Sequence, residues 1–419
     1  MATHIVVGDN QELNRIAGWQ PTIALSDTLR DIPDYWGRVV QKMKTTSNVA
    51  IVHDWVVKLG GAERCLESFV NLLKPRTIFT LLADPESLKH LGIKEAMVQQ
   101  SFVAKLPRAL QWYTMYLPMF PHAVEAWDLR EYDVVLSSSH AVAKGVLTTQ
   151  GQLHVCYCYT PMRYAWDLFF DYLPSNRLLR TLVQLNMHNL RQWDQFSSSR
   201  VDYFIAISEV VARRIWATYR REAEVIYPPV DVDRFSIGVK KEEFFLFVSR
   251  LVKYKKPRLV VETFNQSGLP LVVIGDGPEL KALQKIAKQN ITFLGWQPDD
   301  TVTHYMERAR ALVYPAYEDF GIVPVEAQSA GTSVIAFNKG GVAETVKDLG
   351  ASDSPTGILF EEQTVQSLEG AIRTFCEHEG QFKPEALRRH AEQFGAQRFA
   401  EQITHFIGTK YRQFQGRKQ

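Results

Sequence analysis

The sequence predicts an α/β protein with two doubly wound, parallel-sheet domains that face a cleft. Three observations support this prediction. From Asn48 onward, short apolar segments alternate with helix-length amphipathic segments, which is the pattern of buried parallel strands joined by right-handed crossovers. The alternation is interrupted at residues 227–235 (YPPVDVDRF), where two prolines disfavour both a helix and a central strand. The length of 419 residues suits two domains of ordinary size.

The first series of elements begins at residue 48. Gly60-Gly61 precedes a segment whose apolar positions follow helical spacing, and Ser208 is placed to cap a helix over residues 209–219. The predicted strands are NVAIVHD (48–54), RTIFTLL (76–82), YDVVLSS (132–138), LHVCYCY (153–159) and VDYFIAI (201–207). This series forms the predicted N-terminal domain, residues 48–227.

The second series forms the predicted C-terminal domain, residues 228–395. Its predicted strands are FFLFVS (244–249), PLVVIG (270–275), ITFL (291–294), ALVYP (311–315), SVIAF (333–337) and GILF (357–360). Two amphipathic helices, at about 384–394 and 396–413, end the chain, and we expect the last to pack back on the first domain. Residues 1–47 show weak periodicity and are interpreted as an N-terminal extension of unknown role.

Composition narrows the function classes. The 48 Lys and Arg residues nearly balance the 46 Asp and Glu residues, which argues against a nucleic-acid partner. There is no apolar run long enough for a membrane-spanning helix, and the N-terminus lacks the features of a signal peptide, so we expect a cytoplasmic location. The spacing of the four cysteines suits neither a metal site nor a disulfide framework, so we interpret them as buried free thiols.

Glu318 and Glu326 are the most informative candidate site residues. Glu318 lies in the loop that follows a predicted strand, where ligands of open parallel sheets bind, and Glu326 lies about one turn into the next helix. The free backbone N–H groups around Phe320 to Val323 form an anion site at the helix N-terminus. Two carboxylates beside such a turn suit a sugar nucleotide. The alternative is that Glu326 only interacts favourably with the helix dipole.

Three further signals also follow predicted strands. Arg250 and Lys255 lie in the basic loop SRLVKYKKP, where they could neutralise a pyrophosphate. Gly60-Gly61 permits either a close backbone approach to a ligand or only a tight turn. His140 follows a strand end and faces the predicted cleft.

Other motifs are less informative. The segment VIGDGPEL resembles a dinucleotide fingerprint, but Leu280 stands where that fingerprint requires glycine. Asp231 and Asp233 have the spacing of a metal-binding pair, but they lie in the interdomain connection and we expect no metal there. The sequence contains no G-x-x-x-x-G-K-[ST] loop, which argues against an NTPase.

Several motifs together resemble the retaining glycosyltransferases of family 4, which have the two-domain, Rossmann-like GT-B fold. They are GGAER, SRLVKYK, VVIGDGPE, FLGW, the Glu318/Glu326 pair and GGVAET. Within that family, HDW, SSSHAVAKGV, YTPMRYAWD and VIYPPVD resemble bacterial mannosyltransferases that build O-antigen or exopolysaccharide chains from GDP-mannose. The resemblance implies a metal-independent transfer without a cofactor, in which the C-terminal domain binds the nucleotide sugar and the N-terminal domain, with the last helix, faces the acceptor.

The resemblance also implies roles for the basic and glycine residues. Arg250 and Lys255 would bind the diphosphate and stabilise the leaving group. His140 would lie near the reacting sugar. Gly60 and Gly61 would approach the donor phosphates or the acceptor.

The remaining implied roles belong to the segment around the two glutamates. Glu318 and the backbone of Phe320, Gly321 and Ile322 would hold the donor sugar. Glu326 would take the ribose. Two other function classes stay open, a nucleotide-sugar epimerase and a non-catalytic sugar-nucleotide sensor.

A lipid-linked saccharide acceptor would bring the protein to the inner face of the plasma membrane. The segments KLPRALQWYTMYLPMF and NRLLRTLVQLNMHNLRQW combine basic, aromatic and aliphatic residues. Such amphipathic basic surfaces bind anionic headgroups. The alternative is an ordinary core helix with a solvated face.

Overall fold

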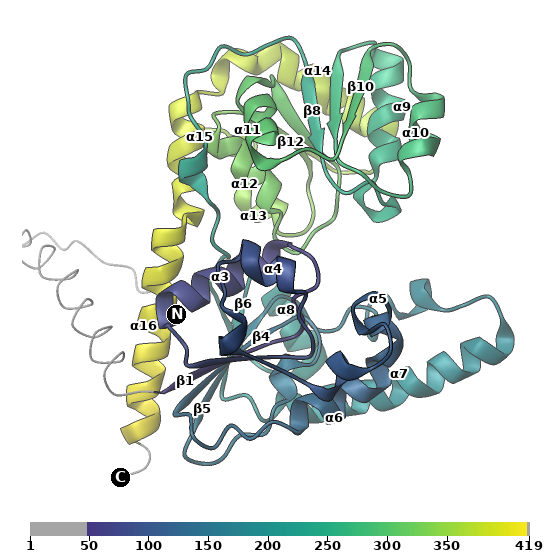
Figure 1. The fold of residues 1–419 in the computed structure, drawn as a ribbon. Helices are drawn as coiled ribbons and strands as arrows, with labels where there is room; N and C mark the ends of the chain where they lie inside the picture. Colours follow the sequence, from purple (N-terminus) through teal and green to yellow (C-terminus); the bar gives the residue numbers. More distant parts are fainter. Residues whose placement is uncertain (1–47, 417–419) are drawn as a thin grey trace, which may run out of the picture. The chain divides into compact units, whose positions relative to one another are not determined.

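The computed structural model describes residues 48–416, and its strands form two parallel sheets (Figure 1). The first sheet has seven strands in the order β3-β2-β1-β4-β5-β6-β7, and the second has six in the order β10-β9-β8-β11-β12-β13. In each sheet the chain first builds outward in one direction and then returns to build in the other. The predicted doubly wound α/β fold is therefore confirmed. The predicted N-terminal extension lies outside the described residues.

The strands match the predicted apolar segments. Those of the first sheet are β1 (Val49–His53), β2 (Thr77–Thr80), β3 (Val98–Gln100), β4 (Val134–Ser139), β5 (Leu153–Cys158), β6 (Tyr203–Ala206) and β7 (Ala223–Val225). Those of the second are β8 (Phe245–Val248), β9 (Leu271–Ile274), β10 (Ile291–Gly295), β11 (Ala311–Tyr314), β12 (Ser333–Phe337) and β13 (Gly357–Phe360). The sequence did not reveal β3 and β7, because each is a three-residue edge strand that includes polar residues and has no apolar run.

Helices connect the strands in both series. The first series contains α3 (Gly61–Leu73), α4 (Pro85–His90), α5 (Ala109–Trp112), α6 (Phe120–Glu125), α7 (Arg177–Ser198) and α8 (Glu209–Tyr219). The second contains α9 (Pro257–Ser267), α10 (Leu280–Ile286), α11 (Asp299–Arg308), α12 (Ile322–Ser329), α13 (Val342–Thr345), α14 (Val365–His378), α15 (Pro384–Ala391) and α16 (Ala396–Gly416).

Short 3-10 helices complete the chain. They are η1 (Glu95–Met97), η2 (Phe102–Lys105), η3 (Tyr113–Met119), η4 (Ala143–Gly145), η5 (Phe169–Tyr172), η6 (Val232–Arg234), η7 (Lys253–Lys255), η8 (Glu379–Gln381) and η9 (Glu392–Phe394). Within residues 48–416, no helix is both long enough and apolar enough to cross a membrane.

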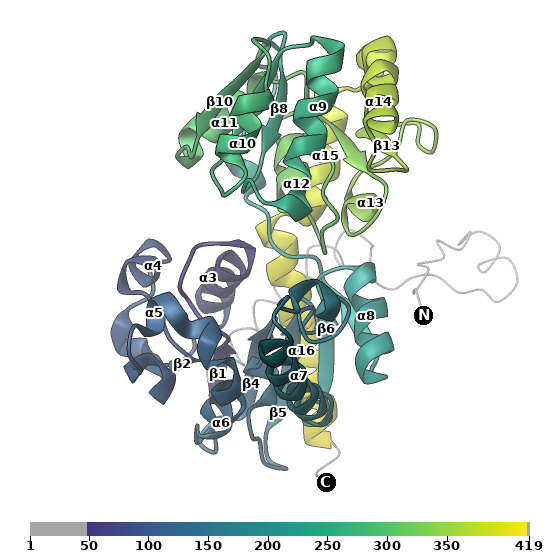
Figure 2. The same ribbon diagram turned by 90° about the vertical axis from the view of Figure 1, so that its right-hand side faces the viewer.

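The second sheet is covered on both faces, which explains why its strands are continuous apolar runs. Along β12, Ile335 and Phe337 join one buried cluster, while Val334 and Ala336 join the other. Residues of α9, α10 and α14 contribute to the first cluster, and α9 and α14 lie side by side in Figure 2. Residues of α11, α12 and α13 contribute to the second cluster.

Helix α16 packs against elements of the first sheet. The Phe399 ring lies 5.3 Å from that of Phe69 in α3 and 5.8 Å from that of Tyr157 in β5. Further along the helix, the Phe406 ring lies 6.2 Å from that of Tyr203 in β6. The segment between β7 and β8 contains the domain boundary that we place near residue 228, which stays a prediction.

The cysteines correct one expectation. Cys65, Cys156 and Cys158 are free and buried, as predicted. Cys376 is free but exposed, because it follows Phe375 on α14 and points away from the core that Phe375 enters. Its sulfur lies 3.7 Å from the Arg310 guanidinium.

Candidate active site

The predicted site residues follow the strands at which each sheet reverses direction. The reversal lies between β1 and β4 in the first sheet and between β8 and β11 in the second. Ligands of doubly wound sheets bind beyond the carboxyl ends of these strands. Asp54 and His140 follow β1 and β4, while Arg250 and Glu318 follow β8 and β11.

Glu318 and Lys255 form a largely buried ion pair. The Lys255 Nζ contacts Glu318 Oε1, and the Tyr314 hydroxyl donates a hydrogen bond to Oε2. Burial raises the pKa of Glu318 to about 7, with a smaller contribution from the charge of Asp319. Burial also lowers the pKa of Lys255 to about 8, helped by the charge of Arg250. The direct contact opposes both pKa shifts, since it favours the charged forms of both side chains.

The loop that carries Glu318 is held by the glycine pair of the GGVAET motif. The Gly341 N–H donates a hydrogen bond of 2.9 Å to the Glu318 carbonyl oxygen. A Cβ atom on Gly340, where φ is +84°, would lie 2.3 Å from that same oxygen. Gly321, with φ +86°, then leads into α12 at Ile322. The first turn of α12 thus directly follows the loop of Glu318, and its first backbone N–H groups have no partner within the helix.

Glu326 is buried on α12 and is held by two arginines. Arg234 and Arg64 contact its Oε1 at 3.0 and 3.3 Å, and both also contact Asp299 Oδ2, at 3.1 and 3.3 Å. Burial raises the pKa of Glu326, while the two guanidinium groups act in the opposite direction. Glu326 is the fifth residue of α12 and lies beyond the first turn, so a favourable interaction with the helix dipole does not explain why a carboxylate stands there.

Arg250 is exposed in the loop after β8, and a glycine turn supports that loop. Gly275 and Gly277 have φ values of +134° and +158°. Cβ atoms there would lie 1.9 Å from the Ser249 carbonyl oxygen and 2.4 Å from that of Leu251. The GDGP segment, set aside as a dinucleotide motif, therefore positions the basic loop.

The glycine pair of the first domain lies against α12. A Cβ atom on Gly61 would lie 2.9 Å from Ile322 Cδ1. Gly60 precedes α3 in extended conformation, with φ −152°. The structure thus brings Gly60-Gly61 next to Ile322, which the sequence assigned to donor binding.

His140 is fixed through Asp54, which sequence analysis did not single out. The Asp54 carboxylate accepts hydrogen bonds of 2.6–2.9 Å from the backbone N–H groups of four consecutive residues, His140 to Ala143. The His140 Nδ1 lies 3.2 Å from Asp54 Oδ2, and its ring meets that of Trp55 edge-on at 4.5 Å. The signal in the sequence was an acidic residue directly after the central strand β1.

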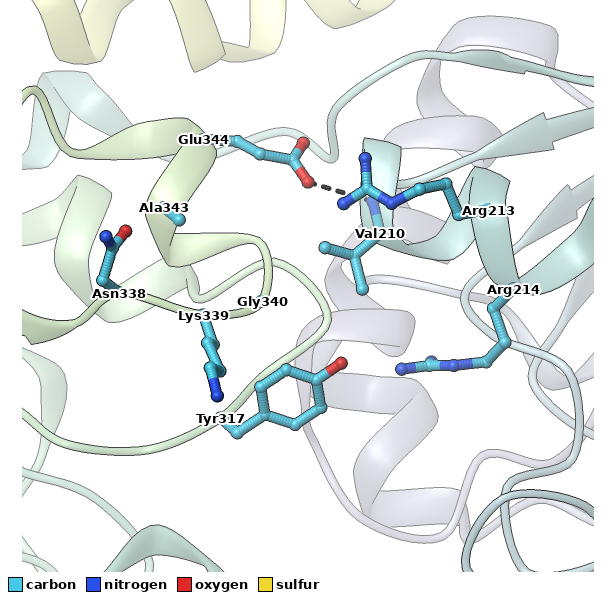
Figure 3. Close-up of a pocket in the computed structure, with 9 residues that line it drawn as sticks. All are labelled: Val210, Arg213, Arg214, Tyr317, Asn338, Lys339, Gly340, Ala343 and Glu344. Carbon is cyan, nitrogen blue, oxygen red and sulfur yellow. Dashed lines mark hydrogen bonds between the residues drawn. The ribbon is translucent and has the colours of Figure 1, made fainter. Parts of the chain in front are cut away.

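A cavity of about 540 Å³ lies between α8 and the loop after β12 (Figure 3). Glu344 accepts hydrogen bonds from the N–H groups of Glu209 and Val210, at 2.9 and 3.0 Å. Arg214 extends toward Tyr317 in Figure 3 and donates a hydrogen bond of 2.9 Å to Asp319. The cavity is lined by Val210, Arg213, Arg214, Tyr317, Asn338, Lys339, Gly340, Ala343 and Glu344.

One member of the acid pair in the connecting segment has an ion-pair partner. Asp233 forms an ion pair of 2.9 Å with Arg388, while Asp231 directly precedes η6 and its side chain does not cap that helix. In the part of the chain that the structure describes, no group of three or more His, Cys, Asp or Glu side chains is arranged to hold a metal ion.

Two family descriptions match adjacent parts of the chain. Residues 59–234 match Glycosyltransferase Family 4, and residues 230–397 match Glycosyl transferases group 1. Both descriptions are of glycosyltransferases, and together they cover residues 59–397.

Curated relatives match this chain over part of their own length. It is 29% identical over 195 residues to a D-inositol 3-phosphate glycosyltransferase of Mycobacteroides abscessus, covering 41% of this chain and 43% of the relative. The chain is 28% identical over 268 residues to the alpha-1,3/1,6-mannosyltransferase ALG2 of Saccharomyces cerevisiae, covering 49% of this chain and 52% of the relative. The chain spans about half the length of the curated relatives it matches.

Solved structures share the fold of this chain. Anabaena Alr3699/HepE in complex with UDP has a TM-score of 0.61 at 18% identity, over 86% of this chain and all of that one (100%). WaaG, a glycosyltransferase involved in lipopolysaccharide biosynthesis, has a TM-score of 0.59 at 17% identity, over 86% of this chain and 99% of WaaG. These similarities support the GT-B fold.

Proposed function

We propose that the chain is a retaining glycosyltransferase that moves a hexose from a nucleotide sugar to a saccharide acceptor. The observation that carries this proposal is the grouping of Glu318, Lys255 and Arg250 at the reversal of the second sheet, beside Gly61 at the start of α3. It combines a carboxylate for sugar hydroxyls with two cations for a diphosphate.

The proposed chemistry depends on fixed charges. When the bond between the anomeric carbon and the diphosphate oxygen breaks, negative charge grows on the diphosphate and positive charge on the sugar. Arg250 and Lys255 stabilise the diphosphate, and their loop is held rigid by Gly275 and Gly277, so little reorganisation is needed. Glu318 accepts hydrogen bonds from the sugar hydroxyls. These residues act without a metal ion or cofactor in this proposal.

Glu326 is proposed to hold the ribose. Both arginines contact its Oε1, and within residues 48–416 no hydrogen bond or ion pair engages Oε2. That oxygen is therefore the one we assign to the ribose hydroxyls. Arg234 and Arg64 favour the charged form of the buried carboxylate, and a charged acceptor makes stronger hydrogen bonds.

The proposed donor is GDP-mannose. Support comes from the mannosyltransferase-like motifs and from the yeast relative, whose name describes a mannosyltransferase. The Anabaena structures contain UDP or UDP-glucose instead. Thermal denaturation with GDP-mannose, UDP-glucose and ADP-glucose tests the choice, because a ligand that binds only the folded state raises the melting temperature. We expect the largest rise with GDP-mannose, and a larger rise with UDP-glucose would contradict it.

A turnover assay separates the three function classes. Labelled GDP-mannose is incubated with and without a lipid-linked saccharide. A glycosyltransferase labels the saccharide, an epimerase changes the free nucleotide sugar without an acceptor, and a sensor changes neither. We expect label in the saccharide, as part of O-antigen or exopolysaccharide synthesis.

Peripheral binding to the inner face of the plasma membrane is proposed through α7. Its Leu178, Leu182 and Leu185, at positions i, i+4 and i+7, form a stripe in which the side chains are 75%, 51% and 59% exposed. Arg177 and Arg180 lie on the same turns. An exposed leucine stripe with adjacent cations fits an anionic lipid surface.

The elements beside this stripe extend the same surface chemistry. In Figure 1, α7 projects to the right from the first sheet. Phe170 and Tyr172 of η5, which precedes α7, are 77% and 66% exposed, and Met115 of η3 is 72% exposed. On the other face of α7, Met187 and Leu190 pack into the core, so the alternative of an ordinary core helix accounts for that face but not for the leucine stripe.

Flotation with vesicles tests this proposal. We expect the wild-type protein to float with phosphatidylglycerol vesicles at low salt and to stay at the bottom with phosphatidylcholine vesicles. The triple variant Leu178→Ser, Leu182→Ser, Leu185→Ser should lose flotation. Trp216→Ser, on α8 at a position 52% exposed, is the control and should float. Wild-type protein that stays at the bottom in both cases would contradict membrane binding.

A further inference from the structure

Glu63 carries a largely buried carboxylate that has no cationic partner. It lies on α3, directly after the residues Gly60 to Ala62, and is 7% exposed. No ion pair within residues 48–416 involves it, and burial raises its pKa, with opposing contributions from backbone hydrogen bonds and the charge of His140. Burying an unpaired carboxylate is costly, so its place in the molecule needs an explanation.

Helix capping explains part of its position. Glu63 is the third residue of α3, and the carboxylate turns back toward the N-cap, where a Cβ atom on Gly60 would lie 3.0 Å from Glu63 Oε2. Gly60 has no side chain to complete a capping box, but the Glu63 carboxylate turns back as the third helical residue does in that motif, where glutamine also occurs. Capping therefore does not explain why this position has an ionisable carboxylate. The substitution Glu63→Gln keeps the capping acceptor and removes only the charge.

Aromatic rings lie beyond the carboxyl ends of β1 and β4 in the first sheet. The Trp55 indole lies 4.5 Å from the His140 ring and 5.2 Å from the Tyr113 ring, measured between centroids. All three are half-buried, so each keeps an accessible part. Partly exposed aromatic faces with a few fixed polar groups are typical of small-ligand sites, and the apolar face of a sugar ring packs well on them.

The start of α3 lies beside both this aromatic group and α12. The Tyr159 hydroxyl donates a hydrogen bond of 3.1 Å to the Ala62 carbonyl oxygen, and the Tyr159 ring lies 6.2 Å from that of His140. Gly61, two residues before Glu63, lies against Ile322 at the start of α12. Glu63 therefore lies on the first-domain side of the space where Arg250 is proposed to bind the leaving diphosphate.

We propose that Glu63, Trp55 and Tyr113 form the subsite for an uncharged acceptor sugar ring. This inference rests on the proposed function. The Glu63 carboxylate accepts hydrogen bonds from acceptor hydroxyls and so orients the ring, while the indole and phenol rings pack on its apolar face. Glu63 is a positioning residue in this arrangement. Because its charge has no cationic partner, it repels a carboxylate in the same place, so the subsite selects a neutral hexose over a uronic acid.

The test uses octyl glucoside and octyl glucuronide as probes. With protein saturated with GDP, saturation-transfer NMR measures binding of each probe. We expect the wild-type protein to bind the glucoside at least about tenfold more tightly than the glucuronide. Glu63→Gln should weaken glucoside binding by about tenfold and reduce the discrimination against the glucuronide. Trp55→Ala should weaken both probes, and Trp55→Phe should restore part of the binding.

Matched controls separate this role from a structural one. Glu67→Gln changes the same chemical group one turn further along α3 and should leave probe binding and discrimination unchanged. Glu63→Gln should keep the melting temperature and the affinity for the nucleotide within twofold of wild type. Unchanged discrimination in Glu63→Gln, an equal effect of Glu67→Gln, or no glucoside binding by the wild type would overturn the inference. Failure of nucleotide-sugar binding is measured separately and would contradict the proposed function itself.

Discussion

At the scale of single residues, the candidate site contains largely buried carboxylates whose charged forms are stabilised by neighbouring cations. Glu318 is paired with Lys255, and Glu326 with Arg234 and Arg64. In each case burial disfavours the charged carboxylate and a neighbouring cation favours it. The pKa values of Glu318 and Lys255, at about 7 and about 8, lie near neutral pH, which gives the site a measurable pH dependence.

The first prediction is a narrow bell-shaped pH profile of kcat/KM. Glu318 must be ionised to accept sugar hydroxyls, and Lys255 must be protonated to bind the diphosphate. Since the pKa of Glu318 is raised to about 7 and that of Lys255 lowered to about 8, activity should rise through about pH 7 and fall through about pH 8. Lys255→Arg should move the falling limb to higher pH, because arginine stays protonated. A flat profile from pH 6 to 9 in the wild type would contradict these roles.

The second prediction concerns Arg234, whose loss leaves Glu326 with one cation. Arg234→Leu should lower the free energy of unfolding by about 2 kcal/mol, because a buried carboxylate loses a charged partner. Donor KM should rise about tenfold. Glu326→Gln in the same background should recover stability but not donor KM. Urea denaturation and donor titrations measure both quantities, and recovery of donor KM would show that Glu326 is only structural.

At the scale of elements, glycines let the site loops approach one another. Gly340 and Gly341 meet the loop of Glu318, and Gly275 and Gly277 meet the loop of Arg250. The sequence placed all strands except β3 and β7, because buried parallel strands are apolar on both faces. It also located the loops, since they follow those strands. It could not reveal these loop-to-loop contacts, which join segments far apart in the chain and leave no periodic pattern.

The third prediction is that Gly340→Ala damages both stability and catalysis. Its φ of +84° is strained for alanine, and the new Cβ would lie 2.3 Å from the Glu318 carbonyl oxygen. We expect a loss of at least about 2 kcal/mol in the free energy of unfolding and a fall in kcat as the loop moves. Gly370→Ala is the control, because its Cβ meets no atom within 4 Å and lies in α14. That substitution should stabilise the protein slightly.

At the scale of the whole described chain, side chains join the elements of the two sheets. Arg64 of α3 contacts Glu326 of α12, and Arg214 of α8 contacts Asp319. The sequence motifs GGAER and GGVAET gave no hint of such contacts, because Arg64 and Glu344 each find partners in the other half of the chain. The periodicity of apolar residues was enough to predict the fold. The partners of Arg64 and Glu344 could be identified only from the structure.

The last prediction compares two caps on one helix. Ser208 Oγ accepts the Val211 N–H of α8 at 3.2 Å, and Glu344 accepts the two preceding N–H groups from the second series of elements. Removing either cap, by Ser208→Ala or Glu344→Ala, should lower the free energy of unfolding by about 1 kcal/mol. Only Glu344→Ala should also lower kcat, because Glu344 closely follows the Gly340-Gly341 pair that holds the Glu318 loop. Urea denaturation and steady-state kinetics of both variants provide the measurement. Equal kcat values in the two variants would mean that the contact between α13 and α8 stabilises the helix without positioning the site.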